Sequence, residues 1–264
     1  MEGVNIKAPQ PRDERGGKPT NRKDFMDLIL ELRQKGNIEG KNFGDDKLNS
    51  VELTESVIAA QSFVFYVGGY GTSATTITYM LYELAKNPHI QDRVVAEIDE
   101  VLARYNGEIS YEALSELTYM DQTFSETLRK YPIIDPLQRN AQSDLKLPGT
   151  NVTIRKGQTV LVPLWAIHRD PKYYPNPEKF DPERFLPENE QNRHPCAYMP
   201  FGTGPRKCIG TRFAKVQSKV CITKLLSKFR VEPSKNTLIK MNYDPMRLII
   251  SPAGGIPLNI VRRK

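Results

Sequence analysis

The stretch "FGTGPRKCIG", residues Phe201 to Gly210, places one of the chain's three cysteines among three glycines, a proline and two basic residues. A cysteine kept for packing alone would more often lie within an apolar stripe. The stretch fits the pattern F-x-x-G-x-R-x-C-x-G, whose five fixed positions would arise by chance in roughly a few per hundred thousand chains of this length. The pattern therefore indicates that Cys208 has a chemical role.

A helix is predicted directly after this loop, over Thr211–Phe229. Its apolar stripe consists of Phe213, Val216 and Val220, and a basic stripe beside it consists of Arg212, Lys215 and Lys219. Cys208 thus precedes a helix N-terminus, where unpaired N–H groups and the helix dipole favour a thiolate over a thiol.

The longest predicted helix contains the stretch 57–82, which carries no charged residue. A plausible start is Asn49, with Glu52 three residues later, and the stop is Asn87-Pro88. An uncharged stretch of this length could span a bilayer. Gln61, three glycines and several Ser/Thr residues dilute its apolar character, so the sequence favours a helix through the middle of a large domain.

The remaining patterns predict further helices and a small β part. The other predicted helices are Lys23–Gly36, Pro88–Tyr105 and Tyr119–Lys130, the last capped by Thr118. Leu137–Pro163 shows short alternating stretches around Pro148-Gly149 and Lys156-Gly157, which predict β-hairpins. Asp170–Glu188 is rich in proline and is predicted to be a meandering loop. The predicted fold class is mainly α with a small β part.

Composition limits the function classes. The 264 residues include 38 basic and 31 acidic ones, and the net charge of +7 is spread along the chain. That spread favours a solvated surface over a nucleic-acid binder, which salt-dependent DNA retention would reveal. Three cysteines without CxxC spacing argue against a disulfide framework and a zinc ribbon, and indicate a reducing compartment. Residues 1–22 are polar, carry no signal-peptide pattern and are predicted to be a flexible lead-in.

The cysteine loop resembles the cysteine-ligand loop of the cytochrome P450 family. The resemblance implies that Cys208 binds the iron of heme b as a thiolate, a ligand that donates electron density and favours O–O cleavage. It also implies that Arg206 pairs with a heme propionate. Phe201, Gly204 and Gly210 would belong to the cofactor site, because the glycines let the backbone approach the sulfur and the flat macrocycle.

Two shorter motifs precede the loop in the order that the family shows. They are "ETLR" at Glu126–Arg129 and "PERF" at Pro182–Phe185. E-x-x-R alone is expected about once by chance in a chain this long. In this order, however, the resemblance implies that Glu126, Arg129 and Arg184 form a buried charge network with a structural role.

A third motif, "GGYGTS" at Gly68–Ser73, lies inside the longest predicted helix. The resemblance implies that Gly68 and Gly69 open a groove for oxygen, and that the Thr72 hydroxyl steers protons to iron-bound dioxygen. The family's acid before the threonine is replaced by Gly71, which leaves the usual acid–threonine proton delivery in question. Three glycines in four residues weaken a helix by about 1 kcal/mol each. We therefore expect a local opening of the helix there.

The resemblance extends from Lys23 to the C-terminus, and its details are similar to insect microsomal detoxification P450s. It implies an incomplete heme-thiolate domain at 23–264, with the N-terminal half and the membrane anchor missing. The full-length protein is expected on the cytosolic face of the endoplasmic reticulum. Its electrons would come from NADPH, indirectly, through NADPH–cytochrome P450 reductase, and cytochrome b5 is a further partner that the resemblance suggests. The basic stripe after the loop is either a solvated face or the surface where that donor docks.

Three functions remain open on these grounds. The first is a heme-thiolate monooxygenase that inserts one atom of O2 into an apolar small molecule, either a xenobiotic or an endogenous lipid-like compound. The second is a non-catalytic fragment unable to hold heme, which a test of heme retention would distinguish. The third is a P450-like isomerase or dehydratase, which Gly71 permits and which would not need reductase and NADPH. Pro132–Leu137 and the helix carrying Thr72 are the segments left to line a substrate pocket.

Overall fold

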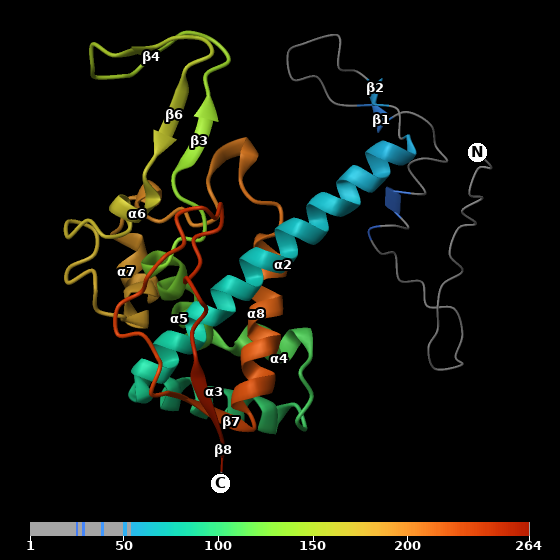
Figure 1. The fold of residues 1–264 in the computed structure, drawn as a ribbon, viewed down its shortest axis with the longest axis vertical. Coiled ribbons are helices and arrows are strands. Elements are labelled where there is room, and N and C mark those ends of the chain that lie inside the picture. Colours follow the sequence, from blue (N-terminus) through green and yellow to red (C-terminus); the bar gives the residue numbers. More distant parts are fainter. Residues whose placement is uncertain (1–24, 26–27, 30–37, 40–49, 52–53, 264) are drawn as a thin grey trace. The chain divides into compact units, whose positions relative to one another are not determined.

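The computed structural model describes residues 25, 28–29, 38–39, 50–51 and 54–263 (Figure 1). The chain divides into two compact units, Met1–Val67 and Gly68–Lys264. In the first unit, β1 (Ile38–Glu39) pairs antiparallel with β2 (Ser50–Val51). Phe25, Leu28 and Ile29 are helical, in agreement with the helix predicted over Lys23–Gly36. The predicted flexible lead-in at 1–22 lies outside the described residues.

The longest helix, α2, spans Glu55–Lys86. It starts later than predicted, because Ser50–Val51 are a strand and Thr54 accepts the first hydrogen bonds, from the N–H groups of Val57 and Ile58. It ends before Asn87, as predicted. The expected local opening at the glycines is wrong, since α2 is helical without interruption through Gly68–Ser73. In the described part of the chain, no helix, α2 included, combines the length and apolar character that crossing a membrane requires.

The second unit consists mainly of helices, which confirms the predicted fold class. Besides the last part of α2, its α-helices are α3 (Pro88–Arg104), α4 (Tyr111–Glu116), α5 (Thr118–Lys130), α6 (Leu164–Ile167), α7 (Pro187–Gln191) and α8 (Thr211–Leu226). Its 3-10 helices are η1 (Pro182–Phe185), η2 (Pro195–Ala197) and η3 (Gly204–Arg206). Asp170–Glu188, which is predicted to be a meandering loop, lies within the described residues. It contains the short helix η1, and α7 begins near its end, at Pro187.

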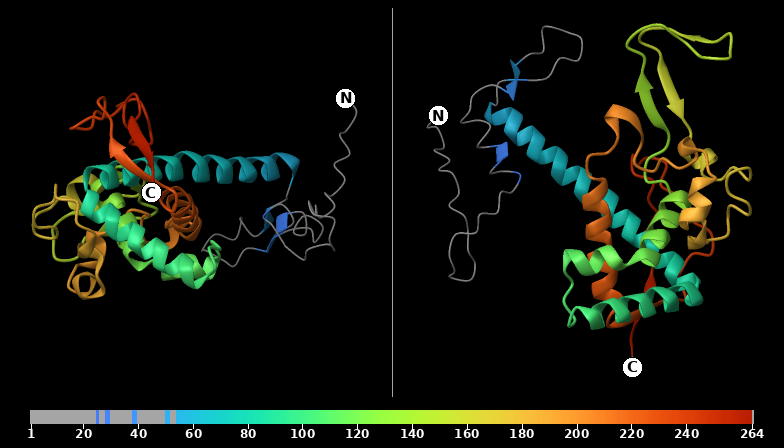
Figure 2. Two further views of the ribbon diagram at one scale, coloured as in Figure 1. Left: turned by 90° about the horizontal axis from the view of Figure 1, so that it is seen from below. Right: turned by 180° about the vertical axis from the view of Figure 1, so that it is seen from behind.

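The β part consists of short antiparallel pairs. β3 (Leu137–Asn140) pairs with β6 (Thr159–Val162), and β4 (Leu145–Lys146) pairs with β5 (Thr153–Ile154), so the predicted hairpins are confirmed. Gly149 and Gly157 adopt positive φ at the predicted turns. These strands project from the helices, while β7 (Phe229–Pro233) and β8 (Leu258–Arg262) lie side by side near the C-terminus (Figures 1 and 2).

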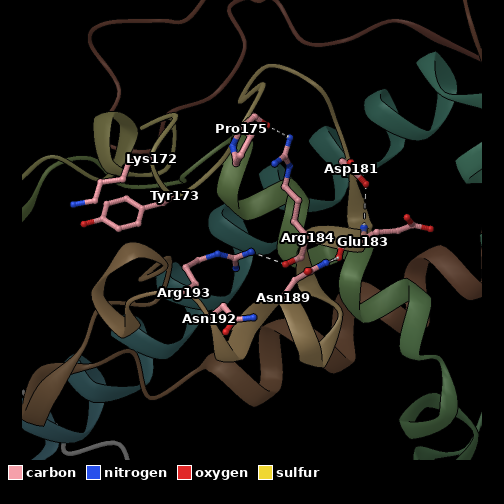
Figure 3. Close-up of a pocket in the computed structure, with 9 residues that line it drawn as sticks. All are labelled: Lys172, Tyr173, Pro175, Asp181, Glu183, Arg184, Asn189, Asn192 and Arg193. Carbon is pink, nitrogen blue, oxygen red and sulfur yellow. Dashed lines mark hydrogen bonds between the residues drawn. The ribbon is translucent and has the colours of Figure 1, made fainter.

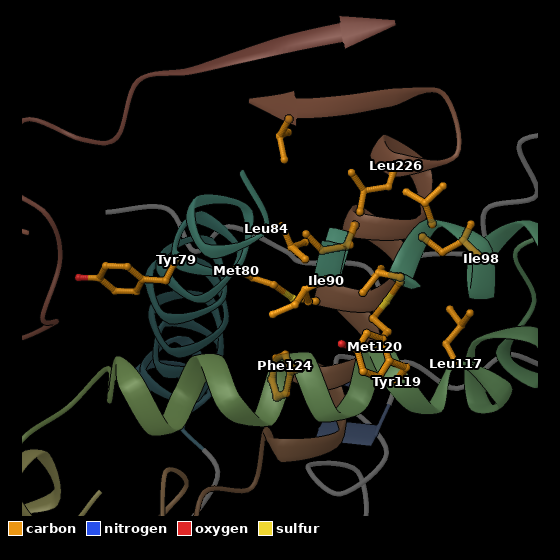
Figure 4. Close-up of a cluster of buried hydrophobic side chains, with 14 of the residues drawn as sticks. Tyr79, Met80, Leu84, Ile90, Ile98, Leu117, Tyr119, Met120, Phe124 and Leu226 are labelled. Atoms are coloured by element: carbon orange, nitrogen blue, oxygen red, sulfur yellow. The ribbon is translucent and has the colours of Figure 1, made fainter. Parts of the chain in front are cut away.

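The hydrophobic core of the second unit lies where the end of α2 meets α3, α5 and α8 (Figure 4). Its fully buried members include Tyr79, Met80, Leu84, Ile98, Met120, Phe124, Ile222 and Leu226. The first part of α2 differs, because Phe63, Val64 and Phe65 are exposed. The prediction that this helix runs through the middle of a domain therefore holds here only for its C-terminal part.

Two predictions about helix ends are corrected. Thr118 does not cap α5; the carboxylate of Glu97, in α3, accepts hydrogen bonds from the N–H groups of Tyr119 (2.7 Å) and Met120 (2.9 Å) instead. The helix α8 ends at Leu226 rather than Phe229, because Phe229 already pairs in β7.

The buried face of α8 also differs from the predicted apolar stripe. It consists of Ser218, Lys219, Ile222, Thr223 and Leu226, whereas Phe213 is 57% exposed. Val216 and Val220 are only partly buried at the edge of the core. A helix that carries polar residues on its buried side cannot be oriented from its apolar residues alone.

Candidate cofactor site

The cysteine loop is a tight backbone turn between the chain after η2 and the start of α8. The N–H of Cys208 donates to the carbonyl of Phe201 (2.8 Å), which closes the loop on itself. Gly204 adopts a φ of +74°, a left-handed conformation that favours glycine and lets the chain turn into η3. The ring of Phe201 stacks on Phe124 of α5, with centroids 6.4 Å apart and planes at 15°. The core thus fixes the base of the loop.

Cys208 lies two residues before the N-cap of α8, Gly210. Its thiol is free and exposed. The Thr211 hydroxyl donates to the Cys208 carbonyl (3.0 Å), which ties the loop to the first residue of the helix. A Cβ on Gly210 would lie 3.7 Å from the Cys208 sulfur, so glycine keeps the space beside the sulfur open. The sulfur is therefore presented to solvent next to a helix N-terminus.

Two arginines belong to the cysteine loop or contact it. Arg206 is exposed on the loop itself. Arg139, on β3, reaches the loop from the hairpin: its Nη2 is 3.5 Å from the carbonyl oxygen of Thr203. No sequence motif points to Arg139, because it lies 64 positions before Thr203 and only the fold brings β3 beside the loop. Its place in a strand that directly follows the E-x-x-R helix was the only available signal.

The residues of the loop suit a heme with a thiolate ligand. The exposed thiol would supply the ligand, and Arg206 and Arg139 would supply cations for the propionates. Ile209 and Phe213 are 82% and 57% exposed and supply apolar surface for a macrocycle. Phe201, Gly204 and Gly210 shape the loop and do not bring a polar side chain to the sulfur.

The glycines of α2 are used in different ways. A Cβ on Gly68 would meet no described atom within 4 Å. A Cβ on Gly69 would lie 3.1 Å from the ring of Phe213, so the absence of a side chain there accommodates a residue of α8. A Cβ on Gly71 would lie 2.9 Å from Cδ1 of Ile249, so the place of the family's acid is filled by an apolar side chain.

Thr72 lies on the same helix, one turn after Gly68. Its hydroxyl donates to the Gly68 carbonyl, which leaves the hydroxyl oxygen free to accept a hydrogen bond from a water molecule. Gly69 of α2 and Phe213 of α8 therefore lie against each other. The Thr72 hydroxyl, by contrast, bonds to the backbone of its own helix.

Glu126 and Arg129 form a fully buried ion pair on α5. Two nitrogens of Arg129 contact the two carboxylate oxygens of Glu126, at 2.6 and 2.8 Å. Nε of Arg184, in η1, lies 3.5 Å from the same carboxylate, and the N–H of Asp181 donates to it at 2.9 Å. Burial raises the pKa of the Glu126 carboxyl, while the hydrogen bonds from Arg129 and Asp181 oppose that rise.

This network holds the loop that precedes the cysteine loop. Arg129 also donates to the carbonyls of His168 (2.9 Å) and Pro177 (2.7 Å), and Arg184 donates to Pro175 (2.7 Å). The three charged side chains thus fix the ends of a segment with little regular structure to α5. The geometry is that of a structural brace, because the charged groups of Glu126 and Arg129 are fully buried.

A polar cleft of about 420 Å³ lies beside this brace (Figure 3). Lys172, Tyr173, Pro175, Asp181, Glu183, Arg184, Asn189, Asn192 and Arg193 line it. The carboxylates of Glu183 and Asp181 pair with Arg93 (2.8 Å) and Lys179 (3.1 Å). Most of these lining residues are charged or polar, so the cleft does not match an apolar substrate, and Arg184 is the one predicted site residue among them.

The basic stripe predicted on α8 is reduced to two residues. Arg212 is exposed and Lys215 is half-buried. Lys219 is buried instead, with its Nζ 3.1 Å from Oδ2 of Asp121 on α5. The prediction that Lys219 belongs to a basic surface stripe is wrong.

Comparisons with known proteins agree with these features. The chain matches the family model described as cytochrome P450 over residues 7–259. It is 63% identical over 252 residues to cytochrome P450 6B4 of Papilio glaucus, which covers 95% of this chain and 50% of that protein. It is 44% identical over 242 residues to cytochrome P450 6a2 of Drosophila melanogaster, which covers 91% and 47%. The chain spans about half the length of the curated relatives it matches, and the predicted likeness to insect P450s is confirmed.

Proposed function

The chain belongs to the cytochrome P450 family, and we propose that it forms the cysteine-bearing half of a heme-thiolate monooxygenase. The observation that carries this proposal is the exposed Cys208 thiol just before α8, in a loop that contains Arg206 and is contacted by Arg139. The substrate is proposed to be an apolar small molecule, which receives one atom of O2. When bound, heme supplies the iron at which O2 is reduced and split.

The residues of the loop hold and tune that cofactor. Cys208, two residues before the N-cap of α8, would hold the heme iron through its sulfur. Arg206 and Arg139 would pair with the propionates, where charge-assisted hydrogen bonds would contribute about 1.5–3 kcal/mol each. The stacking of Phe201 on Phe124 keeps the loop in place. Gly204 and Gly210 keep side chains away from the macrocycle and the sulfur.

Proton supply is assigned to the Thr72 hydroxyl. Its proton, which the Gly68 carbonyl accepts in this structure, becomes available to the site when that hydrogen bond breaks. Because Ile249 fills the space next to Gly71, water replaces a carboxylate as the source that returns a proton to Thr72. We propose that Gly69 serves this site by admitting the Phe213 ring, which brings α8 close to α2.

The partners are proposed from the charge around the loop. Lys207 and Arg212 are exposed beside Cys208 and offer a basic surface to an acidic electron donor. NADPH–cytochrome P450 reductase, with cytochrome b5 as a second donor, fits that requirement, and NADPH then acts only through the reductase. The proposed location of the whole protein is the cytosolic face of the endoplasmic reticulum.

The reduced-CO difference spectrum of the chain, loaded with heme, tests the proposal. We expect a strongly red-shifted Soret band that is lost in Cys208→Ser and kept in the control variants Cys196→Ser and Cys221→Ser. A band at the unshifted position would mean that the thiolate is protonated or replaced. The absence of any band would favour the alternative that this chain alone is a non-catalytic fragment.

A second measurement separates a monooxygenase from an isomerase or dehydratase. Both would give the red-shifted band, but only the monooxygenase needs electrons. We expect product formation from an apolar test substrate only when reductase and NADPH are both present. Turnover of an already oxygenated substrate in their absence would support the rearranging enzyme instead.

A further inference from the structure

The helix α8 has its strongest apolar anchors far from Cys208. Ile222 and Leu226, in its last two turns, are fully buried, whereas Phe213, in its first turn, is 57% exposed. Apolar contacts are non-directional, so by themselves they specify the position of a helix less sharply than an ion pair does. A directional contact in the middle of α8 would therefore add to these apolar anchors in fixing its axial position.

Lys219 supplies a directional contact at the middle of α8. Its side chain is 6% exposed, and its Nζ is 3.1 Å from Oδ2 of Asp121, which is 35% exposed. Burial lowers the pKa of the Lys219 amine, and attraction to Asp121 opposes that effect. A buried ammonium that loses its carboxylate is strongly unfavourable, whereas a displaced methylene chain is not. The pair therefore forms at one axial position of α8 on α5.

Asp121 is itself held in place by the neighbouring helix. It belongs to the first turn of α5, whose N–H groups at Tyr119 and Met120 donate to the Glu97 carboxylate of α3. The position of Asp121 is thus set by α3, and that of Lys219 by Asp121. One polar chain links α3, α5 and α8.

We propose that the Lys219–Asp121 ion pair sets the axial register of α8 on α5 and thereby positions Cys208. The loop is joined to the first residue of α8 through the hydrogen bond from Thr211 to the Cys208 carbonyl. A slip of α8 by one helical turn would shift that residue by about 5.4 Å. Lys219 is then a positioning residue for the cysteine, and only the assignment of Cys208 as a cofactor ligand rests on the proposed function.

The first experiment uses the chain without heme and with Cys208 as its sole thiol, in a Cys196→Ser and Cys221→Ser background. The variants are Lys219→Met, which keeps the length of the side chain, and the double variant Lys219→Met with Asp121→Leu. Lys224→Met, an exposed lysine of the same helix, is the matched control. The readouts are the rate of Cys208 alkylation by iodoacetamide and the hydrogen-exchange protection of residues 201–216.

We expect the double variant to unfold at the same urea concentration as the parent or a higher one. Its alkylation rate should nevertheless change by threefold or more, and protection at 201–216 should fall by tenfold or more. Lys224→Met should change neither. A double variant as stable as the parent, with unchanged alkylation and exchange, would overturn the proposal.

A charge swap keeps the test decisive if the apolar variants do not fold. Lys219→Asp alone places two carboxylates together and should disturb the loop, while Lys219→Asp with Asp121→Lys restores an opposite pair. Recovery of the alkylation rate to within twofold of the parent supports a register role. A swapped pair as disturbed as the single variant contradicts it.

The heme-loaded chain provides a spectroscopic readout. We expect the double variant to convert part of the red-shifted reduced-CO band into the unshifted one, while total heme stays the same. If the parent chain takes up no heme, the proposed function fails, but the alkylation and exchange data still decide on the register. The two ideas can thus fail separately.

Discussion

His168 shows how burial, more than any other factor, sets the charge of a side chain. Its imidazole is fully buried, and its Nε2 accepts a hydrogen bond from the N–H of Met199 (3.2 Å). Burial lowers its pKa to about 4, and the nearby positive charge of Arg129 acts in the same direction. The folded protein therefore keeps His168 neutral at pH values where the unfolded chain protonates it.

This pKa predicts a loss of stability in acid. Because the folded pKa is depressed below the ordinary value of about 6.5, the unfolded state binds the extra proton as the pH falls from 6.5 towards 4. We expect His168 to contribute a loss of about 2 kcal/mol in the free energy of unfolding between pH 7.5 and 5. Urea unfolding across this range measures it. In His168→Gln that share should disappear, and equal pH slopes in parent and variant would refute the assignment.

The effect of a side chain at position 71 depends on Ile249, which lies against Gly71. A side chain at position 71 would meet Cδ1 of Ile249 at 2.9 Å, closer than real Cβ contacts. We expect Gly71→Glu, which restores the family's acid, to destabilise the chain by about 1–3 kcal/mol through overpacking. The partner Ile249→Ala should relieve much of this cost, and urea unfolding of the four combinations measures it. A double variant that shows no relief would mean that Ile249 moves aside freely.

The sequence predicted chemistry at single residues where a motif carried it. The cysteine loop and the E-x-x-R pair are local patterns with fixed spacing, so Cys208, Glu126 and Arg129 could be selected without a structure. Arg139 contacts Thr203, 64 positions away, and Ile249 contacts Gly71, 178 positions away. No sequence motif predicts contacts at such separations. Lys219 was misassigned for the related reason that a lysine is usually exposed, while here α5 offers it a carboxylate.

At the scale of elements, the start of α5 depends on a side chain from another helix. The Glu97 carboxylate accepts from two backbone N–H groups, and the Thr118 hydroxyl donates to it as well (3.2 Å). We expect Glu97→Gln to lower the free energy of unfolding by about 1 kcal/mol, the usual value of an N-cap. Chemical denaturation measures it.

Glu100 provides the control for this prediction. It lies on the same helix and pairs with Arg104, but its side chain is mostly exposed. Glu100→Gln should therefore change the free energy of unfolding by less than about 0.5 kcal/mol, as is typical of a surface pair. If both variants had the same effect, the cap at α5 would contribute no more than a surface contact.

The helices whose ends are encoded locally were predicted best. Asn87-Pro88 and Asn106-Gly107 stop their helices through backbone chemistry that each carries itself, and Asn106 and Gly107 both adopt positive φ. The expected opening of α2 did not occur, because the low propensity of three glycines was outweighed by the rest of a 32-residue helix and by side chains packed onto Gly69 and Gly71. Tertiary contacts therefore determined the conformation at these glycines, where helix propensity alone did not.

At the scale of the whole molecule, the brace of Glu126 and Arg129 connects segments that share little regular structure. Arg129 joins α5 to the carbonyls of His168 and Pro177, while Glu126 receives Arg184 from η1. Together with the buried side chains of Tyr174 and Phe180, the brace holds the chain between α6 and α7 in place. The loop that carries Cys208 follows that chain, so a disturbance there reaches the proposed cofactor site.

Replacing only one member of the Glu126–Arg129 pair should lower the free energy of unfolding by more, per substitution, than replacing both members. Arg129→Met leaves Glu126 buried without its main partner, and Glu126→Leu leaves Arg129 likewise, each with an expected loss of about 3–5 kcal/mol. The double variant exchanges two buried charges for apolar side chains, so its loss should be well below the sum of the two. The carbonyls of His168 and Pro177 lose a donor in both Arg129 variants, which keeps the double variant from being neutral.

Urea unfolding of the four proteins, together with hydrogen exchange over residues 168–186, measures this coupling. We expect exchange protection of that segment to fall in all three variants, because each removes part of the brace. Losses that simply add would show that the two charges act independently of each other. In that case the brace would consist of separate contacts to the backbone, and the ion pair would not be what holds the segment to α5.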